Sequence, residues 1–232
     1  MGKRFVLIGA PGSGKGTWSK ILSDACSLTH ISSGDLFRRE LADDSPLGRE
    51  VRSYVEQGAL VPDELTIQLM QNAFAQGVGR EGFILDGFPR TMSQAEGLDR
   101  ILAETGVKLD AVIALDIDEE ILIQRTLARR VCGVCGQPYN TTVMRPAKEG
   151  ICDRCGGEVV RRSDDTEETL RRRVLAYQKE TAPLVDYYRE RSKLIVFENN
   201  GPPDEAKQQE LFRMLGYLCD GEMTVNTKTD SM

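Results

Sequence analysis

The sequence predicts an α/β fold, a three-layer α/β/α arrangement in which helices cover both faces of a central parallel sheet. Three observations support this prediction. Short apolar runs alternate along the chain with longer amphipathic segments, as in folds built from strand–helix–strand units. The first apolar run leads into a glycine-rich turn that precedes a helical pattern. Residues 131–164 break the alternation, contain four cysteines in two pairs, and predict a small insert of turns and short strands.

The strands are predicted from short runs rich in Val, Ile, Leu and Phe, because parallel strands are covered on both faces. Four runs have this composition, and a fifth run is shorter. The predicted strands are Arg4 to Gly9, Gly82 to Asp86, Ala111 to Ile117 and Leu194 to Glu198, with the shorter candidate Leu28 to Ile31.

Helical periodicity fills most of the intervals between these runs. One further helix is expected to begin at Asp165, which forms an acidic variant of the capping box with Glu168, and to kink or break at Pro183. The other predicted helices are Lys15 to Asp24, Gly34 to Ala42, Leu47 to Gln57, Asp63 to Gln76, Ser93 to Thr105 and Glu119 to Arg129.

Composition limits the classes of partner. The chain has 232 residues and a formal net charge of −6, which argues against general affinity for nucleic acid or anionic membranes. No apolar stretch approaches the roughly 18–20 residues that span a bilayer, and no signal-peptide pattern opens the chain, so we expect a cytoplasmic protein. Residues 219–232 are polar and without period, which predicts a disordered tail.

The glycine-rich turn, Gly9 to Thr17, has the phosphate-binding pattern G-x-x-x-x-G-K, with its hydroxyl residue one place later than in the strict form. Its glycines let successive backbone N–H groups surround phosphate oxygens, and the following helix adds the positive end of its dipole. Lys15 is expected to reach the outer phosphates. A glycine-rich turn without a ligand is the alternative, which the order of strand, loop, lysine and helix disfavours.

A second motif, Asp86-Gly87-Phe88-Pro89-Arg90, closes the strand predicted to end at Asp86. A carboxylate at the carboxyl end of a parallel strand, beside a phosphate loop, is placed to hold the water shell of Mg²⁺. Arg90 supplies a planar fork for phosphate. A simple turn residue is the alternative at Asp86, and the neighbouring loop makes it less favoured.

The paired cysteines have the C-x₂-C-x₁₆-C-x₂-C spacing of a zinc ribbon. In a reducing compartment this spacing favours a metal over disulfides, and four thiolates would fill a tetrahedral Zn²⁺ and make it structural. Four cysteines without a metal are the alternative. The predicted ligands are Cys132, Cys135, Cys152 and Cys155.

Together with Gln94 and the stretches Ser32-Ser33-Gly34-Asp35 and Arg162-Ser163-Asp164-Asp165, these motifs closely resemble the adenylate kinase family, from about Lys3 to Leu215. The resemblance implies a P-loop fold and the reversible reaction ATP + AMP ⇌ 2 ADP, with Mg²⁺, by a monomer. It also implies a core of residues 1–131 and 165–218, an AMP-side segment at 32–61 and a zinc-binding lid at 131–164, as in the zinc-bearing bacterial members.

The resemblance carries an ATP site over, position by position. The lid residues Pro138 and Tyr139 would cover the ATP base, and the acidic residues Asp164 and Asp165 would help to latch the closed lid. The remaining ATP contacts would be Gly12, Ser13, Gly14, Lys15, Gly16, Thr17 and Arg129.

The AMP site follows in the same way. Gln94 would read the adenine edge, while Arg38 and Arg90 would hold the AMP phosphate. The other AMP contacts would be Ser33, Ala59, Leu60, Val61, Gly87, Phe88, Pro89, Arg162 and Arg173.

The catalytic residues implied by the resemblance surround the transferring phosphoryl group. Such a group carries negative charge on its equatorial oxygens, so a chain with one histidine and many arginines suits the reaction. His30 itself is expected to be structural or at the surface. The implied catalytic residues are Lys15, Asp86, Arg90, Arg125, Arg129, Arg162 and Arg173, whereas a solvated helix face is favoured for Arg130, Arg161, Arg171 and Arg172.

Two competing interpretations stay open. Another nucleoside monophosphate kinase, acting on UMP, CMP or GMP, is disfavoured by Ser33, Gln94 and the zinc-type lid. A nucleic-acid-binding zinc ribbon is disfavoured by the net charge and by basic residues that group around phosphate motifs. We therefore expect nucleotides as partners, with no nucleic acid and no membrane. At Trp18 the sequence departs from the family, which more often carries glutamine there.

Overall fold

The computed structural model describes residues 2–57, 59–142, 144–161 and 167–216. The chain divides into two compact units, Met1–Asn200 and Gly201–Met232. The second unit carries one described helix, α9 (Glu205–Met214), which the sequence patterns did not single out. The side chain of Asp204 caps it by accepting a hydrogen bond from the Lys207 N–H at 3.0 Å. The predicted tail, 219–232, lies outside the described residues.

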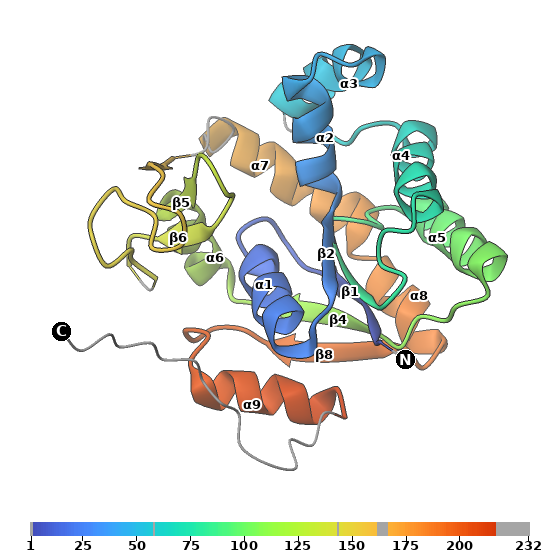
Figure 1. The fold of residues 1–232 in the computed structure, drawn as a ribbon. Helices are drawn as coiled ribbons and strands as arrows, with labels where there is room; N and C mark the ends of the chain where they lie inside the picture. Colours follow the sequence, from blue (N-terminus) through green and yellow to red (C-terminus); the bar gives the residue numbers. More distant parts are fainter. Residues whose placement is uncertain (1, 58, 143, 162–166, 217–232) are drawn as a thin grey trace. The chain divides into compact units, whose positions relative to one another are not determined.

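A parallel sheet of five strands forms the centre of the first unit (Figure 1). All five predicted strands are present, and they pair in the order β2-β3-β1-β4-β8. The central strand is β1, so the loop that follows it opens at the middle of the carboxyl edge of the sheet. The strands are β1 (Arg4–Ile8), β2 (Thr29–Ser32), β3 (Phe83–Asp86), β4 (Ala111–Asp116) and β8 (Leu194–Glu198).

The three inner strands of this sheet are buried on both faces, as the apolar runs predict, whereas the edge strands β2 and β8 are partly exposed. Val6 and Ile8 on β1 pack in a cluster with Leu98 and Leu184. The alternate residues on β1 point to the opposite face, and Leu7 there is also only 1% exposed. The three-layer α/β/α prediction is therefore confirmed.

The helices follow the predicted order between the strands, and their ends differ from the predicted ends by a few residues. Helix α6 stops at Leu127 instead of Arg129, because Arg129 pairs with Asn140 in the sheet of the insert. The helices are α1 (Lys15–Cys26), α2 (Ser33–Ala42), α3 (Pro46–Gln57), α4 (Asp63–Ala75), α5 (Met92–Thr105), α6 (Glu119–Leu127), α7 (Glu167–Ala176), a π-helical turn (Tyr177–Thr181) and α8 (Leu184–Glu190).

The long predicted helix changes character before Pro183. It becomes a π-helical turn and resumes as α8 after the proline, which cannot donate the helical hydrogen bond. The predicted capping residue Asp165 lies outside the described residues.

The segment 32–61 has a small apolar cluster with its neighbour α4. Phe37 from α2 and Val51 from α3 pack there with Val61 and Leu69. Its buried residues differ from those of the larger cluster around the central sheet, and Leu36 packs against both clusters. The division into core, AMP-side segment and lid stays a prediction.

The insert has its own antiparallel sheet, in the order β6-β5-β7. Its strands are β5 (Arg129–Cys132), β6 (Pro138–Asn140) and β7 (Val159–Val160). Such short strands between turns match the predicted insert. Among the helices that the structure describes, none has the length and apolar composition to cross a membrane.

Candidate active site

The glycine-rich loop connects β1 to α1 at the centre of the sheet. Gly12 and Gly14 have φ angles of 90° and 91°, in the left-handed region that favours glycine. A Cβ on Gly12 would lie only 2.0 Å from the Thr126 hydroxyl. The loop therefore needs glycine at Gly12 for two reasons, the backbone angle and the close approach of α6.

Lys15 begins α1, and its side chain turns back over the loop. Its Nζ donates to the carbonyl oxygens of Gly9 at 2.7 Å and Ala10 at 3.0 Å. Burial lowers the pKa of Lys15 to about 8, the charge of Asp86 opposes this shift, and the charges of Arg90, Arg129 and Arg173 add to it. Three predicted arginines thus lie close enough to Lys15 to disfavour its positive charge.

Asp86 ends β3 beside the loop, because β3 pairs with β1. A Cβ on Gly16 would lie 3.7 Å from its Oδ2, so the carboxylate reaches the start of α1. Burial raises the pKa of Asp86, but the nearby His30 and the charges of Lys15 and Arg90 outweigh it and hold the pKa below its ordinary value. An ionised carboxylate beside a phosphate loop fits the oxygen preference of Mg²⁺.

His30 is one site neighbour that sequence patterns missed. Its Nε2 lies 3.7 Å from Asp86 Oδ2. In the β2–β3 pairing Ser32 is opposite Asp86, so His30, two residues earlier, projects from the same face. The contact between His30 and Asp86 follows from the pairing of β2 with β3. The apolar run of one strand does not reveal which strand pairs with it.

A second cluster forms around Gly87, whose φ is 79°. Its carbonyl accepts hydrogen bonds from the Ser33 hydroxyl and from Arg90 Nε, both at 2.7 Å. A Cβ on Gly87 would lie 2.8 Å from the Arg90 guanidinium and 2.9 Å from the Ser33 oxygen. The structure thus brings together three predicted AMP-side residues, because Ser33 and Gly87 directly follow β2 and β3, which pair.

Gln94 lies behind this cluster and is 2% exposed. Its Oε1 accepts from the Arg90 N–H at 2.8 Å, and its Nε2 donates to Asp63 at 2.8 Å. Asp63 also accepts from the Thr91 hydroxyl at 2.9 Å. Each amide atom has capacity for one further hydrogen bond. Asp63 and Thr91, which position this amide, were not predicted because their contacts join distant segments.

The other predicted AMP-side residues lie near the start of α4 and on α2. Leu60 and Val61 line a cavity of about 590 Å³ together with Ala59, Arg172 and Lys179. Arg38 pairs with Asp35 one turn earlier on α2. Phe88 is buried, and a cis peptide joins it to Pro89.

The remaining predicted arginines fall into three groups. Arg129 and Arg173 are half-buried, and the charges of both lower the pKa of Lys15. Arg125 donates to the carbonyls of Asn199 at 2.7 Å and Asn200 at 3.1 Å. Arg162, Asp164 and Asp165 lie outside the described residues.

Of the arginines assigned to solvated faces, three are exposed and one, Arg130, is half-buried. Arg172 pairs with Glu168 and donates to the Gln57 carbonyl at 3.3 Å. The others are Arg161 and Arg171.

The predicted ATP-covering residues lie on β6 of the insert. Pro138 is half-buried, whereas Tyr139 is 5% exposed and its hydroxyl donates to Cys152 Sγ at 3.4 Å. The side chain of Tyr139 therefore points to the cysteines.

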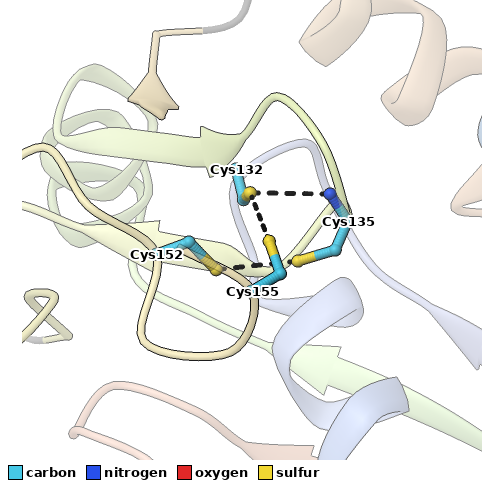
Figure 2. A group of neighbouring side chains, drawn as sticks. All are labelled: Cys132, Cys135, Cys152 and Cys155. Carbon is cyan, nitrogen blue, oxygen red and sulfur yellow. Dashed lines mark hydrogen bonds between the residues drawn. The ribbon is translucent and has the colours of Figure 1, made fainter. Parts of the chain in front are cut away.

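The four paired cysteines converge (Figure 2). All their sulfur atoms lie within 4.8 Å of one another, with Cys132 to Cys155 at 3.5 Å and Cys135 to Cys152 at 3.6 Å. Sulfur atoms of a tetrahedral Zn²⁺ site are about 3.8 Å apart, given a zinc–sulfur bond of about 2.3 Å. Backbone N–H groups of Val134 and Cys135 point at Cys132 Sγ, which stabilises a thiolate. The donor set fits zinc.

Comparison with known proteins places this geometry in a family. A family model described as adenylate kinase matches residues 7–193. The chain belongs to the adenylate kinase family. It is 44% identical to an adenylate kinase of Clostridium tetani over 202 residues, 87% of this chain and 94% of that protein. It is 45% identical to one of Acidothermus cellulolyticus over 203 residues, 88% of this chain and 94% of that protein.

A third relative, an adenylate kinase of Acetivibrio thermocellus, is 42% identical over 213 residues, 92% of this chain and 98% of that protein. Adenylate kinases are nucleoside monophosphate kinases, so the chain is a phosphotransferase, as the motifs indicated. The match to the adenylate kinase model includes the glycine-rich loop, Gln94 and all four paired cysteines. The roles of the individual residues stay predictions.

Proposed function

We propose that the chain transfers the γ-phosphoryl group of ATP to AMP, reversibly, and so makes two ADP. The observation that carries this proposal is the position of two predicted phosphate-binding clusters at the carboxyl ends of the paired strands β1 and β3. The glycine-rich loop lies on one side, and the cluster of Ser33, Gly87 and Arg90 includes an arginine that acts on the pKa of Lys15.

On the donor side, the loop N–H groups and Lys15 would hold the ATP phosphates. Lys15 now donates to carbonyls of its own loop, and burial lowers its pKa. An incoming anion would favour its charged form. Pro138 and the backbone of Tyr139 would cover the ATP base.

On the acceptor side, Arg90 and Arg38 would bind the AMP phosphate. Gln94 would read the adenine edge, because an amide can donate and accept at once. Its present partners, the Arg90 N–H and Asp63, would fix its orientation. Backbone around Ala59 to Val61 would close over the base.

In the transfer, the bond between the γ-phosphorus and its bridging oxygen to the β-phosphate breaks, and an oxygen of the AMP phosphate forms the new bond. The attacking oxygen is already anionic, so no strong base is required. Lys15, Arg90, Arg129 and Arg173 would stabilise charge on the equatorial oxygens. Asp86 would hold Mg²⁺, which when bound neutralises phosphate charge.

We further propose structural zinc on the four cysteines of the insert. A closed tetrahedral site leaves no position for water, so the metal would take no part in transfer. We expect a cytoplasmic monomer that acts on free nucleotides, as the resemblance implies.

A coupled assay with ATP and each of AMP, UMP, CMP and GMP tests the proposal. We expect turnover with AMP, dependence on Mg²⁺, and little turnover with the other three. Faster turnover with UMP, CMP or GMP would assign a different acceptor. Binding of an oligonucleotide with no turnover of any monophosphate would contradict the proposal outright.

A further inference from the structure

Asn199 is a buried polar residue at the carboxyl edge of the sheet. It follows β8 directly and is 2% exposed. Its backbone N–H donates to the Asp116 carbonyl at the end of β4, at 2.7 Å. Asn199 therefore lies at the same edge of the sheet as the glycine-rich loop, but it follows β8, whereas the loop follows β1.

The side-chain amide of Asn199 makes two hydrogen bonds, donating in one and accepting in the other. Its Nδ2 donates to the Ser13 carbonyl at 2.6 Å, and its Oδ1 accepts from the Trp18 indole at 3.0 Å. The indole N–H can only donate, so it fixes which amide atom faces the loop. Trp18 is itself held, since it is 1% exposed and packs edge-on against Phe197 with ring centroids 5.0 Å apart.

The bond to the Ser13 carbonyl orients one peptide group of the loop. In a trans peptide the C=O and the following N–H point in opposite directions. With the Ser13 carbonyl turned toward Asn199, the Gly14 N–H points away from Asn199. A Cβ on Gly14 would lie 3.0 Å from Asn199 Nδ2, so the contact is close enough to restrict this peptide.

The same turn also holds Arg125. Its guanidinium donates to the backbone carbonyls of Asn199 and Asn200 at 2.7 and 3.1 Å. One residue thus contacts the loop through its side chain and a predicted site arginine through its backbone.

We propose that Asn199 is a positioning residue for the donor site: it holds the Ser13–Gly14 peptide so that the Gly14 N–H faces the bound phosphates, and Trp18 sets the orientation of its amide. This rests on the proposed function, in which the loop binds the ATP phosphates. Because the acceptor cluster makes no described contact with Asn199, the effect should fall on ATP and spare AMP.

The test is Asn199→Asp, which keeps an acceptor for Trp18 but turns a carboxylate oxygen toward the Ser13 carbonyl. Losing the hydrogen bond and opposing two acceptors should raise the KM for ATP about tenfold or more, with the KM for AMP within about twofold. Affinity for inorganic tripolyphosphate, measured by calorimetry, should fall by a similar factor. The matched control is Asn72→Asp, at an exposed position of α4, which should change none of these values.

Trp18→Phe is the second variant, and it introduces no charge. It removes the donor that orients the amide, together with part of the buried ring that packs against Phe197. It should raise the KM for ATP about threefold and leave the KM for AMP alone. If Asn199→Asp does not fold, Trp18→Phe decides the question.

Equal rises in both KM values, or unchanged tripolyphosphate affinity in a variant that only melts earlier, would reduce Asn199 to a structural residue. Tripolyphosphate binding needs no turnover. A parent protein that binds it but does not phosphorylate AMP would therefore contradict the proposed function, while the affinity of Asn199→Asp for tripolyphosphate would still decide the role of Asn199.

Discussion

The Tyr139 hydroxyl donates to Cys152 Sγ at 3.4 Å and accepts from the Asp153 N–H at 2.8 Å. One buried side chain thus joins the segment expected over the ATP base to the cysteine cluster. The tyrosine side chain is 5% exposed and its hydroxyl faces the cysteines. A contact between this residue and the ATP base therefore has to come from its backbone. We expect the proposed zinc module and the nucleotide cover to move as one body.

Tyr139→Phe should therefore lower stability more than activity. It removes both hydrogen bonds of the hydroxyl, a loss of about 1 kcal/mol, which corresponds to a fall of about 2–4 °C in melting temperature. Calorimetry measures the shift, and Tyr54→Phe, at an exposed tyrosine, serves as the control. A Tyr139→Phe protein that melts with the parent would show that the hydroxyl contributes nothing to the insert.

ATP affinity should fall as pH rises above about 8. In the free protein burial lowers the pKa of Lys15 to about 8 from 10.5 in the unfolded chain. Below pH 8 the folded state carries the cost of the buried charge, and this cost is relieved as pH rises from 8 toward 10.5. Bound phosphate favours the charged lysine, so above pH 8 binding must take up a proton.

The measurement is calorimetry with ATP from about pH 7 to about pH 9.5, in buffers that differ in ionisation enthalpy. The fall should approach tenfold per pH unit, with proton uptake at the alkaline end. Lys15→Arg, which stays charged throughout, should flatten the profile even if it binds more weakly. A parent profile as flat as that of Lys15→Arg would contradict the shifted pKa.

Arg90→Ala should lower turnover by about 10²–10³, because Arg90 is proposed to meet charge that develops during transfer. Arg189→Ala is the matched control, since Arg189 is 58% exposed and pairs only locally, with Asp186 on the same helix. Steady-state rates at saturating ATP and AMP decide between them. Similar losses in both variants would remove Arg90 from the site.

Much of the fold could be predicted because the local sequence of each strand and helix determines its pattern of apolar residues. The three inner strands of the central sheet, β1, β3 and β4, are buried on both faces, so each appears as an uninterrupted apolar run. The edge strand β2 is partly exposed and gives a weaker pattern. The predicted end of α6 was wrong because it depends on a contact between distant residues. Arg129 continues the helical pattern of the sequence, but its strand pairing with Asn140 in the insert ends the helix earlier.

The site was predictable where a motif carries the chemistry, as at Lys15 and the cysteines. It was not predictable where a contact joins distant segments. The His30–Asp86 pair depends on which strands are neighbours. Asn199 carries no motif at all, and only the fold brings it to the Ser13 carbonyl, 186 residues earlier in the chain.

Gln94→Ala should weaken AMP binding and leave ATP affinity nearly unchanged. The variant removes an amide that is proposed to donate and accept at the adenine edge, and it also frees the Arg90 N–H and Asp63. Calorimetry with each nucleotide separates the two effects, with exposed Gln71→Ala as the control. Equal losses for ATP and AMP would place Gln94 outside the acceptor site.

Removing the metal should destabilise the insert while leaving the transfer chemistry partly intact. The described residues of the insert bury few apolar side chains, grouped around Cys132, Tyr139 and Cys152. A metal bound by four thiolates would therefore supply much of its stability, as in small zinc domains that fold only with their metal. Metal analysis should find about one zinc per chain, as four thiolates on one ion require.

The variant Cys132→Ser with Cys155→Ser should lose the zinc and melt at a markedly lower temperature. No cysteine is proposed to touch the phosphoryl group, so activity in the cold should survive in part. The motion of a lid over the substrate commonly limits turnover, and the lid of adenylate kinase is a known example of such a closing element. A loosened insert should therefore change the rate and not abolish it. Cys26→Ser, outside the insert, is the control and should keep both zinc and melting temperature. A zinc-free protein that melts with the parent would contradict the structural role, and a folded zinc-free protein with no activity at any temperature would give the metal a part in the reaction.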